Sequence, residues 1–387
     1  MLLLKRIYIV PLILALFTGS AARAQTGASL NGYLSNMQQT MFEDIRGNWL
    51  NDNLIHNRLN FKAYLGSNLD IALELRNRFV YGETVKYMPG YADLLETDRG
   101  WADMSWNLAA DSSFILNSTI DRLYLDLTLG RLQLTAGRQR INWGMNYVWN
   151  PNDIFNNYSF FDFDYIERPG SDAVRLQYYF GPSASFELAG KINHEEKYTV
   201  AGLFRFTLGG YDFQVLGGLY NEDEFVIGTG FSGYIGPVSL SGELTYLEPV
   251  EESSSLEQAA IGGIGVSYYT PFELMIQFEY IYNQAAEKME LSSFTDFYYR
   301  DISLRDLSFA PHTFFANLSY PVTPLLNTGI SAMTFPKLEG LFIGPSVDLS
   351  IRSNLDLSLI AQYFEGEFQK NTRQNATLAF LRIKWNF

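Results

Sequence analysis

The chain has 387 residues, a formal net charge of −14 and no cysteine. An acidic chain does not suit a nucleic-acid partner, since phosphate backbones are bound by clustered lysine and arginine, and a chain without cysteine has no disulfide framework. Aromatic residues make up 16% of the sequence. No long apolar run follows the N-terminal one, so a transmembrane helix is not expected, whereas abundant Phe and Tyr are typical of a transmembrane β-barrel.

The first 24 residues predict a secretory signal peptide. Lys5-Arg6 gives a positive start, residues 7–17 form an apolar run, and Ala22-Arg23-Ala24 offers a small-x-small cleavage site. The apolar run is shorter than the roughly 20 residues that a membrane-spanning helix needs. We therefore expect residues 1–24 to be removed during export and residues 25–387 to form one domain.

Segments of alternating residue character recur along the rest of the chain. In one of them Leu123, Leu125, Leu127 and Leu129 occupy every second position, so that one side of the strand would face lipid. Most segments are near the roughly 9–11 residues that cross a bilayer as a tilted strand. We predict 18 strands, with 16 as the alternative count, and no helix. The strands are expected near residues 28–36, 56–66, 69–81, 120–129, 132–139, 172–180, 184–193, 199–208, 211–220, 224–235, 238–246, 259–269, 272–282, 311–320, 325–335, 341–351, 355–364 and 375–387.

Tight turns and longer loops alternate between these strands. The tight turns are rich in Gly, Pro, Asn and Ser, as at Gly209-Gly210 and Gly236-Pro237. This alternation is typical of an up-and-down antiparallel barrel with short periplasmic turns and long outer loops, and an even strand count puts both chain ends on the periplasmic side. Three outer loops are long, at about residues 82–113, 140–170 and 283–310.

The last strand ends on an aromatic residue. Trp385 and Phe387 share one side of it and resemble the terminal signal by which outer-membrane barrels are recognised by their insertion machinery. We predict that these two residues form an insertion signal. The expected location is the outer membrane of a Gram-negative-type cell, with outer-membrane lipid and the insertion machinery as partners.

The loop at 140–170 is rich in aromatic and amide side chains. It is the third outer loop, which in porins folds into the lumen and narrows it. Such side chains also commonly stack on sugar rings and bind their hydroxyl groups, although they could instead pack the loop onto the barrel rim. The residues predicted to form the constriction are Trp143, Tyr147, Trp149, Asn152, Phe155 and Tyr158.

A short motif precedes this loop. Gly137-Arg138-Gln139, followed by Asn142-Trp143-Gly144 at a strand end, resembles a motif of a porin-like outer-membrane family. A related Gly-Arg-Gln pattern occurs in alginate-export-type barrels, which have 18 strands. The resemblance implies a solute channel and does not identify the substrate. The alginate type carries a dense arginine pore, whereas this sequence has fewer candidate arginines and an acidic half, so alginate itself is not expected.

The alternation that sets the lipid-facing side of each strand also sets the side that faces the lumen. An 18-stranded barrel is too wide to be filled by side chains alone. We therefore expect a water-filled lumen in which a basic wall faces an acidic wall, a field that orients dipolar solutes; the alternative is an interior filled by buried salt bridges. The predicted basic residues are Arg58, Lys62, Arg76, Arg78, Arg122, Arg175, Arg205, Arg382 and Lys384. The predicted acidic residues are Asp212, Glu243, Glu273, Glu279, Asp348 and Asp356.

No enzyme site is expected. The three histidines, His56, His194 and His312, lie on separate strands or strand ends without metal-ligand spacing. We predict a porin-type channel, without a cofactor, for passive diffusion of small hydrophilic solutes, either saccharides or anions. The alternatives are a closed surface or adhesion barrel and, less favoured, an outer-membrane hydrolase that uses His194. The oligomeric state is left open, with a homo-oligomer as one possibility.

Overall fold

The computed structural model describes residues 26–158, 160, 161, 165, 167–251, 256–291, 293, 302–369 and 372–387. The predicted signal peptide, residues 1–24, lies outside these described residues, and its removal stays a prediction.

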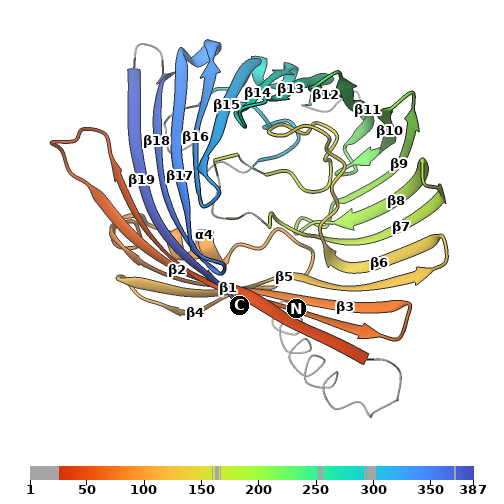
Figure 1. The fold of residues 1–387 in the computed structure, drawn as a ribbon, viewed down its shortest axis with the longest axis horizontal. Helices are drawn as coiled ribbons and strands as arrows, with labels where there is room; N and C mark the ends of the chain where they lie inside the picture. The colour runs from red at the N-terminus through yellow and green to blue at the C-terminus, as the bar shows by residue number, and fades with distance from the viewer. Residues whose placement is uncertain are drawn as a thin grey trace.

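Eighteen antiparallel strands within the described residues close into one barrel (Figure 1). Strands that follow one another in the ring pair with each other, and the ring closes where β1 (Thr26–Phe42) pairs with β19 (Thr372–Asn386). The predicted fold class and the count of 18 are confirmed, and the alternative of 16 is wrong. The other strands of the ring are β2 (Leu50–Leu65), β3 (Leu69–Gly82), β5 (Phe114–Leu129), β6 (Leu132–Gln139), β7 (Ser171–Gly181), β8 (Ala184–Ile192), β9 (Tyr198–Leu208), β10 (Tyr211–Tyr220), β11 (Glu224–Ile235), β12 (Val238–Pro249), β13 (Ala259–Tyr269), β14 (Met275–Asn283), β15 (His312–Thr323), β16 (Leu326–Phe335), β17 (Gly340–Arg352) and β18 (Leu355–Gln369).

The alternation in the sequence becomes an alternation between the two faces of the barrel wall. On β8, Phe186 and Leu188 are exposed on the outside, while Glu187 and Ala189 between them are buried on the inside. Successive strand side chains point to opposite faces, so one register fixes both the outer belt and the lumen.

The turns predicted to be tight lie at one end of the barrel, and the long loops lie at the other, which we call the outer end. Gly209 and Gly210, in the turn between β9 and β10, have φ values of +63° and +83°, a conformation that other residues adopt at a cost. Several strands extend further toward the outer end than predicted. β2 begins at Leu50 rather than at residue 56, because the polar stretch Asn51-Asp52-Asn53 carries no apolar alternation to reveal it.

The expectation that the chain has no helix is wrong for its outer loops. The loop after β3 contains α3 (Glu83–Tyr87) and α4 (Tyr91–Glu96), and two short 3₁₀ helices, η1 (Gln284–Glu287) and η2 (Pro336–Leu338), follow β14 and β16. The same loop holds an unpredicted strand, β4 (Ser105–Ala110), which pairs with β5 and lies outside the ring of 18. These segments are too short for a periodic pattern to predict. None of the helices in the described part of the chain is long and apolar enough to cross a membrane.

A β-bulge in β5 places one extra residue on the lumen side. Glu74 on β3 pairs with Arg122, whereas the next residue, Leu75, pairs with Ile120, so that Asp121 has no partner in the register. A bulge of this kind directs consecutive side chains to the same side of a strand. Asp121 and Arg122 are both buried.

The C-terminal residue is joined to the first strand by a reciprocal pair of backbone hydrogen bonds. The N–H of Gly32 donates to the carbonyl of Phe387 and the N–H of Phe387 donates to the carbonyl of Gly32, both at 3.0 Å. The Trp385 and Phe387 rings are 5.2 Å apart and are exposed on the outer surface. The terminal residue therefore contributes both to closure of the ring and to its aromatic surface.

Deleting Phe387 should impair insertion into the outer membrane and leave export across the inner membrane intact, because the closing bonds and the terminal ring are lost together. The measurement is the amount of folded barrel in outer-membrane fractions. Phe272→Ala, which removes an exposed phenylalanine from a turn, is the matched control. Equal levels of the truncated and full-length proteins would contradict the insertion signal.

Candidate functional site

The segment between β6 and β7 lies inside the ring of strands (Figure 1). Its start is built from the motif found in the sequence. Gly137 has a φ of +116°, and a Cβ there would collide with the carbonyl of Leu123. The Gln139 amide donates to the carbonyls of Thr135 (3.0 Å) and Ala173 (3.1 Å). These contacts fix the direction in which the chain leaves the wall.

Arg138, the central residue of the motif, joins two loops. Its guanidinium donates to the carboxylates of Asp98 at 2.6 Å and Asp172 at 2.7 Å, and to the carbonyl of Ala102 at 2.7 Å. Asp98 and Ala102 belong to the loop between β3 and β5, and Asp172 begins the strand to which the inserted loop returns. The side chain is almost fully buried, so an interior charge is balanced by two carboxylates, as burial requires.

Trp143 anchors the inserted loop against the lumen side of the wall. It is fully buried, its indole N–H donates to the carboxylate of Glu187 on β8 at 2.6 Å, and its ring contacts Phe155 at 4.9 Å between centroids. The Gln214 amide on β10 donates to the carbonyl of Trp143 at 2.8 Å. Further along, Asn152 accepts from the hydroxyl of Thr245 on β12 at 2.7 Å.

Two carboxylates on later strands bind the backbone of the loop. Glu243 on β12 accepts from the N–H groups of Met145, Asn146 (3.0 Å) and Asn152 (2.8 Å). The carboxyl oxygens of one side chain therefore satisfy three backbone N–H groups that burial would otherwise leave without an acceptor.

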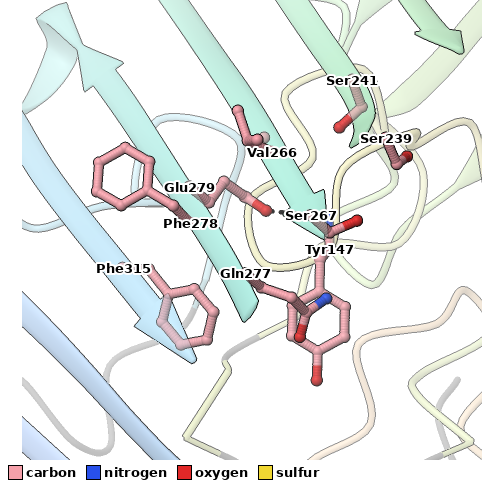
Figure 2. A pocket seen from close by; sticks show the side chains of 10 residues that line it. Tyr147, Ser239, Ser241, Val266, Ser267, Gln277, Phe278, Glu279 and Phe315 are labelled. Atoms are coloured by element: carbon pink, nitrogen blue, oxygen red, sulfur yellow. Dashed lines mark hydrogen bonds between the residues drawn. The ribbon is translucent and has the colours of Figure 1, made fainter. Parts of the chain in front are cut away.

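Glu279 on β14 receives three consecutive N–H groups. It accepts from Tyr147 at 3.0 Å, Val148 at 3.0 Å and Trp149 at 2.6 Å. Figure 2 shows the Glu279 side chain directed from β14 toward Tyr147, beside a small cavity of about 40 Å³. The two glutamates therefore hold the middle of the loop, far from both of its ends.

An aromatic cluster fixes the far side of the loop. Phe160 contacts Phe315 on β15 at 5.1 Å between centroids, and Phe161 contacts Phe342 on β17 at 5.3 Å and Phe364 on β18 at 5.0 Å. These edge-to-face contacts fill part of the lumen with apolar side chains. The loop is thereby packed against the later strands.

The loop residues predicted to form the constriction are placed as follows. Trp143, Trp149, Asn152 and Phe155 are buried between the loop and the wall, and Tyr147 is 56% exposed. Tyr158 lies under the guanidinium of Arg168, 3.2 Å from its ring centroid. In the same loop, burial raises the pKa of Asp153 to about 7.

The predicted acidic wall needs two corrections. Glu243 and Glu279 do point inward, but the loop covers them, so they do not face open lumen. The placement of Glu273 on a strand is wrong: it lies in the turn before β14, with φ +69°, and its N–H donates to the carbonyl of Thr270 at 3.0 Å. Thr270-Pro271 forms this turn because proline cannot donate to the ladder of a strand.

The other predicted acids have local hydroxyl partners. Thr207 donates to Asp212 at 2.6 Å, Ser358 to Asp348 at 2.6 Å and Ser350 to Asp356 at 3.0 Å.

On the early strands, several of the predicted basic residues are structural. Arg58 is fully buried and forms ion pairs with Glu74 and Asp121. Arg76 lies 3.4 Å from Asp121 and stacks on the Tyr165 ring at 3.8 Å. Ion pairs therefore occupy part of the barrel interior. This agrees in part with the alternative expectation of a lumen filled by buried salt bridges.

Two further arginines hold loops. Arg122 donates to the carbonyls of Glu167 and Arg168 at the end of the inserted loop, at 2.8 and 2.7 Å. Arg78 donates to Asn117 at 2.8 Å and to the carbonyl of Leu95 at 3.0 Å.

The remaining predicted basic residues make looser contacts. Lys62 pairs with Asp70 at 2.9 Å and is partly exposed. Arg205 donates to the carbonyl of Asn142 at 3.1 Å, and Arg382 to the hydroxyl of Ser358 at 3.3 Å. Lys384 stacks on Tyr33 at 3.9 Å.

Two cavities lie along the basic side of the lumen. The outer cavity, of about 470 Å³, is lined by residues that include Arg76, Arg138, Tyr165 and Lys191. The inner cavity, of about 400 Å³, lies nearer the short turns. It is lined by Lys62, Asp70, Glu74, Arg122, Tyr124, Asp126, Thr128, Gln133, Thr135, Gln139, Arg140 and Arg175.

Arg140 and Arg175 differ from the other arginines of this wall. Neither guanidinium group has a hydrogen-bond or ion-pair partner among the described residues, and the Nε of each is buried without one. The acids of the inner cavity are engaged elsewhere: Asp70 with Lys62, Glu74 with Arg58, and Asp126 with Gln133 and Thr135. Arg175 was predicted to line the pore. Arg140 was missed, because it lies just beyond β6, where strand alternation no longer assigns a side.

The three histidines lie in separate places, each with its own contacts. His56 is buried against Tyr33, His194 lies 3.4 Å from the carbonyl of Arg99, and His312 contacts the hydroxyl of Tyr280 at 2.8 Å. The described part of the chain contains no group of three or more His, Cys, Asp or Glu side chains that could hold a metal ion.

The fold is similar to those of solved porins. No family model matches the chain, and no curated protein matches it. OccAB4 of Acinetobacter baumannii has a TM-score of 0.58 at 10% identity, covering 95% of this chain and 100% of its own. A BenF-like porin from Pseudomonas fluorescens Pf-5 has a TM-score of 0.61 at 9% identity, covering 93% of this chain and 98% of its own. OprD of Pseudomonas aeruginosa has a TM-score of 0.56 at 8% identity, covering 95% of this chain and 98% of its own. At such identities the likeness establishes the fold.

Changing Glu243 and Glu279 together to Gln should loosen the inserted loop and leave the barrel closed. Six backbone N–H groups share these two carboxyl groups, and each Gln offers one acceptor oxygen and places an NH2 group where the second stood, so several buried donors lose their acceptor at about 1–3 kcal/mol each. The measurement is chymotrypsin cleavage after Trp143, Tyr147 or Trp149 in the folded barrel, which should become faster. Asp356→Asn, an inward acid that does not bind the loop, is the control. Unchanged cleavage would show that the aromatic contacts alone hold the loop.

Proposed function

We propose that the protein is an outer-membrane channel for passive diffusion of small hydrophilic solutes, with a preference for anions. The porin fold, the exposed apolar outer face and the inward loop support a channel that is narrowed by residues 140–170. Because the loop lies against β8–β18, the passage runs along the basic side, through the outer and inner cavities. Selection is by size at the loop and by electrostatic attraction along the wall.

The observation that carries the anion preference is the pair of guanidinium groups at Arg140 and Arg175, which have no hydrogen-bond or ion-pair partner among the described residues. The Glu243 and Glu279 carboxylates, which were expected to balance the field, are covered by loop N–H groups. The solute path therefore meets more available positive than negative charge. A guanidinium group presents several N–H donors in a plane and suits carboxylate, phosphate and sulfate oxygens.

The burial of the loop aromatics favours anions over saccharides. Sugar stacking needs exposed ring faces, and Trp143, Trp149 and Phe155 are buried against the wall. The Tyr158 ring is covered by Arg168. Tyr147 is the exposed ring of the predicted set, so a saccharide platform has little support.

The two alternatives are less well supported. A closed adhesion barrel has no need of two cavities along one wall, and a conductance measurement separates it from a channel. A hydrolase would need a nucleophile or acid beside His194, whose ring instead lies 3.4 Å from the backbone carbonyl of Arg99. A homo-oligomeric assembly and the insertion machinery as a partner stay predictions.

Purified protein in planar bilayers should give discrete conductance steps in KCl, with a reversal potential in a salt gradient that shows anion preference. Absence of steps from folded protein would remove the channel proposal and favour the closed barrel.

Changing Arg140 and Arg175 together to Gln should lower the anion-to-cation permeability ratio. A unit charge about 4 Å from a passing ion in water contributes about 1 kcal/mol, favourable for an anion and unfavourable for a cation, so the ratio should fall by up to roughly 30-fold for each charge removed. Arg131→Gln, in a turn at the inner end where the side chain donates to the carbonyl of Phe180, is the control. A conducting double variant with an unchanged ratio would place the ion path elsewhere.

A further inference from the structure

The small cavity shown in Figure 2 lies where the inserted loop meets β12, β13 and β14. We call it the hydroxyl recess. It lies on the side of the loop that faces the short turns, since Ser239 is the second residue of β12 and follows the tight turn at Gly236-Pro237. Its polar lining consists of one exposed loop residue and four lumen-facing residues of the wall. They are Tyr147, Ser239, Ser241, Ser267 and Gln277.

The wall residues of the recess occupy neighbouring positions on adjacent strands. Ser239 pairs with Ser267, and Ser267 pairs with Gln277, so these three side chains form one row. Adjacent strands lie about 4.8 Å apart, which lets one small solute reach two members of the row. Ser241 pairs with Gly265. A Cβ at Gly265 would lie 2.8 Å from the Ser241 hydroxyl oxygen, so the glycine keeps this part of the recess open.

The polar groups of the recess are available for hydrogen bonding. The hydroxyl groups of Ser239, Ser241 and Ser267 have no hydrogen-bond partner among the described residues. The Gln277 amide accepts from Asn317 at 2.9 Å, and its own N–H groups have no acceptor in the same part of the chain. The recess therefore offers both donors and acceptors to a solute.

These groups are neutral, whereas the inner cavity is lined mainly by charged side chains. Among the described residues that line the recess, only Glu279 is charged, and its carboxyl group accepts from three N–H groups of the loop. A solute carboxylate that entered would lose hydration without gaining a counter-charge, which is costly. A hydroxyl group suits the recess better, because it both donates to and accepts from serine side chains.

The size of the recess also fits hydroxyl groups. One water-sized group needs about 10–15 Å³, so a recess of about 40 Å³ takes roughly three such groups. It is too small for a whole sugar ring, and it can take the hydroxyl groups at one end of a small solute.

The recess lies across the lumen from the basic side. β5, which lines the inner cavity, and β14 are nine strands apart in the ring of 18, so they are on opposite sides of the barrel. An anion that is attracted to the inner cavity turns its carboxylate toward the guanidinium groups. The other end of the molecule then faces the hydroxyl recess.

We propose that the hydroxyl recess is a binding subsite for the hydroxyl groups of polyhydroxylated carboxylates, and that it favours them over alkyl carboxylates of the same charge and size. This rests on the proposed anion channel and names the solute class for it. The basic side attracts the carboxylate, and the recess selects by hydrogen bonding. Stacking on an aromatic ring is not required.

The probe pair is D-glycerate and 2-methylbutanoate, which carries a methyl group in place of each hydroxyl group of glycerate. With the two potassium salts on opposite sides of a planar bilayer, the reversal potential gives the permeability ratio of the two anions. Glycerate should be favoured at least about fivefold, because it can form two hydrogen bonds that each contribute a factor of about 2–10. Equal permeability of the two anions in the unchanged protein would overturn the subsite.

Two variants test the recess in different ways. Ser241→Ala/Ser267→Ala removes two of its hydroxyl groups, and the glycerate preference should fall about fivefold. Gly265→Ala keeps the hydroxyl groups but places a methyl group beside Ser241, so that the preference should fall because the recess is filled. Two independent changes keep the test valid if one variant does not assemble.

Ser331→Ala/Ser358→Ala is the matched control. These serines face the lumen outside the recess and already donate, to the carbonyl of Gly344 at 3.2 Å and to Asp348 at 2.6 Å. The control should keep the glycerate preference of the unchanged protein. A preference that both recess variants retain in full would overturn the subsite. Loss of anion preference in a KCl gradient would contradict the proposed function instead, and it is measured before either organic anion is added.

Discussion

The structure depends on how a loop inside a barrel satisfies its backbone. In an 18-stranded ring the backbone N–H and C=O groups of the strands pair with each other. A segment that enters the lumen must therefore find hydrogen-bond acceptors among the inward side chains. Glu243 and Glu279 provide them, and each takes three N–H groups of the loop. Gln214 and Thr245 complete the attachment through Trp143 and Asn152. The loop is therefore fixed against one side of the barrel rather than suspended across it.

This attachment determines which charged side chains of the lumen remain without partners. The sequence distributes acids and bases over opposite walls, which would suggest a symmetric transverse field. Once the loop is in place, Glu243 and Glu279 accept hydrogen bonds from its backbone. On the opposite wall, Arg58 and Arg76 form ion pairs with Asp121, and Arg58 also pairs with Glu74. A small set of guanidinium groups beside the inner cavity is left without such partners among the described residues. In the channel that we propose, selectivity depends on these remaining charges rather than on the net charge of either wall.

The strands could be predicted from the sequence because a two-residue period is set locally, by which side of each strand meets lipid. All 18 predicted strands are present, and the turn residues explain their ends. The loops could not be predicted in the same way. The roles of Glu279 and Phe315 depend on partners 130 or more residues earlier in the chain, and no periodic signal links Glu279 to Trp149. Arg140 lies one residue past a strand, where the period ends, and the alternation predicts a strand through Glu273 because its turn, residues 270–274, interrupts the pattern for only five residues.

The contacts that hold the inserted loop also constrain the order in which the barrel folds. Residues 140–161 are bound by β8, β10, β12, β14, β15, β17 and β18, strands that follow them in the chain by as many as 200 positions. The loop can take its final position only after nearly the whole wall exists, and contacts with such large sequence separation form slowly. In a partly formed barrel this aromatic segment lacks most of its contacts with the wall. Docking of the loop is therefore a late step in folding, and it marks closure of the ring.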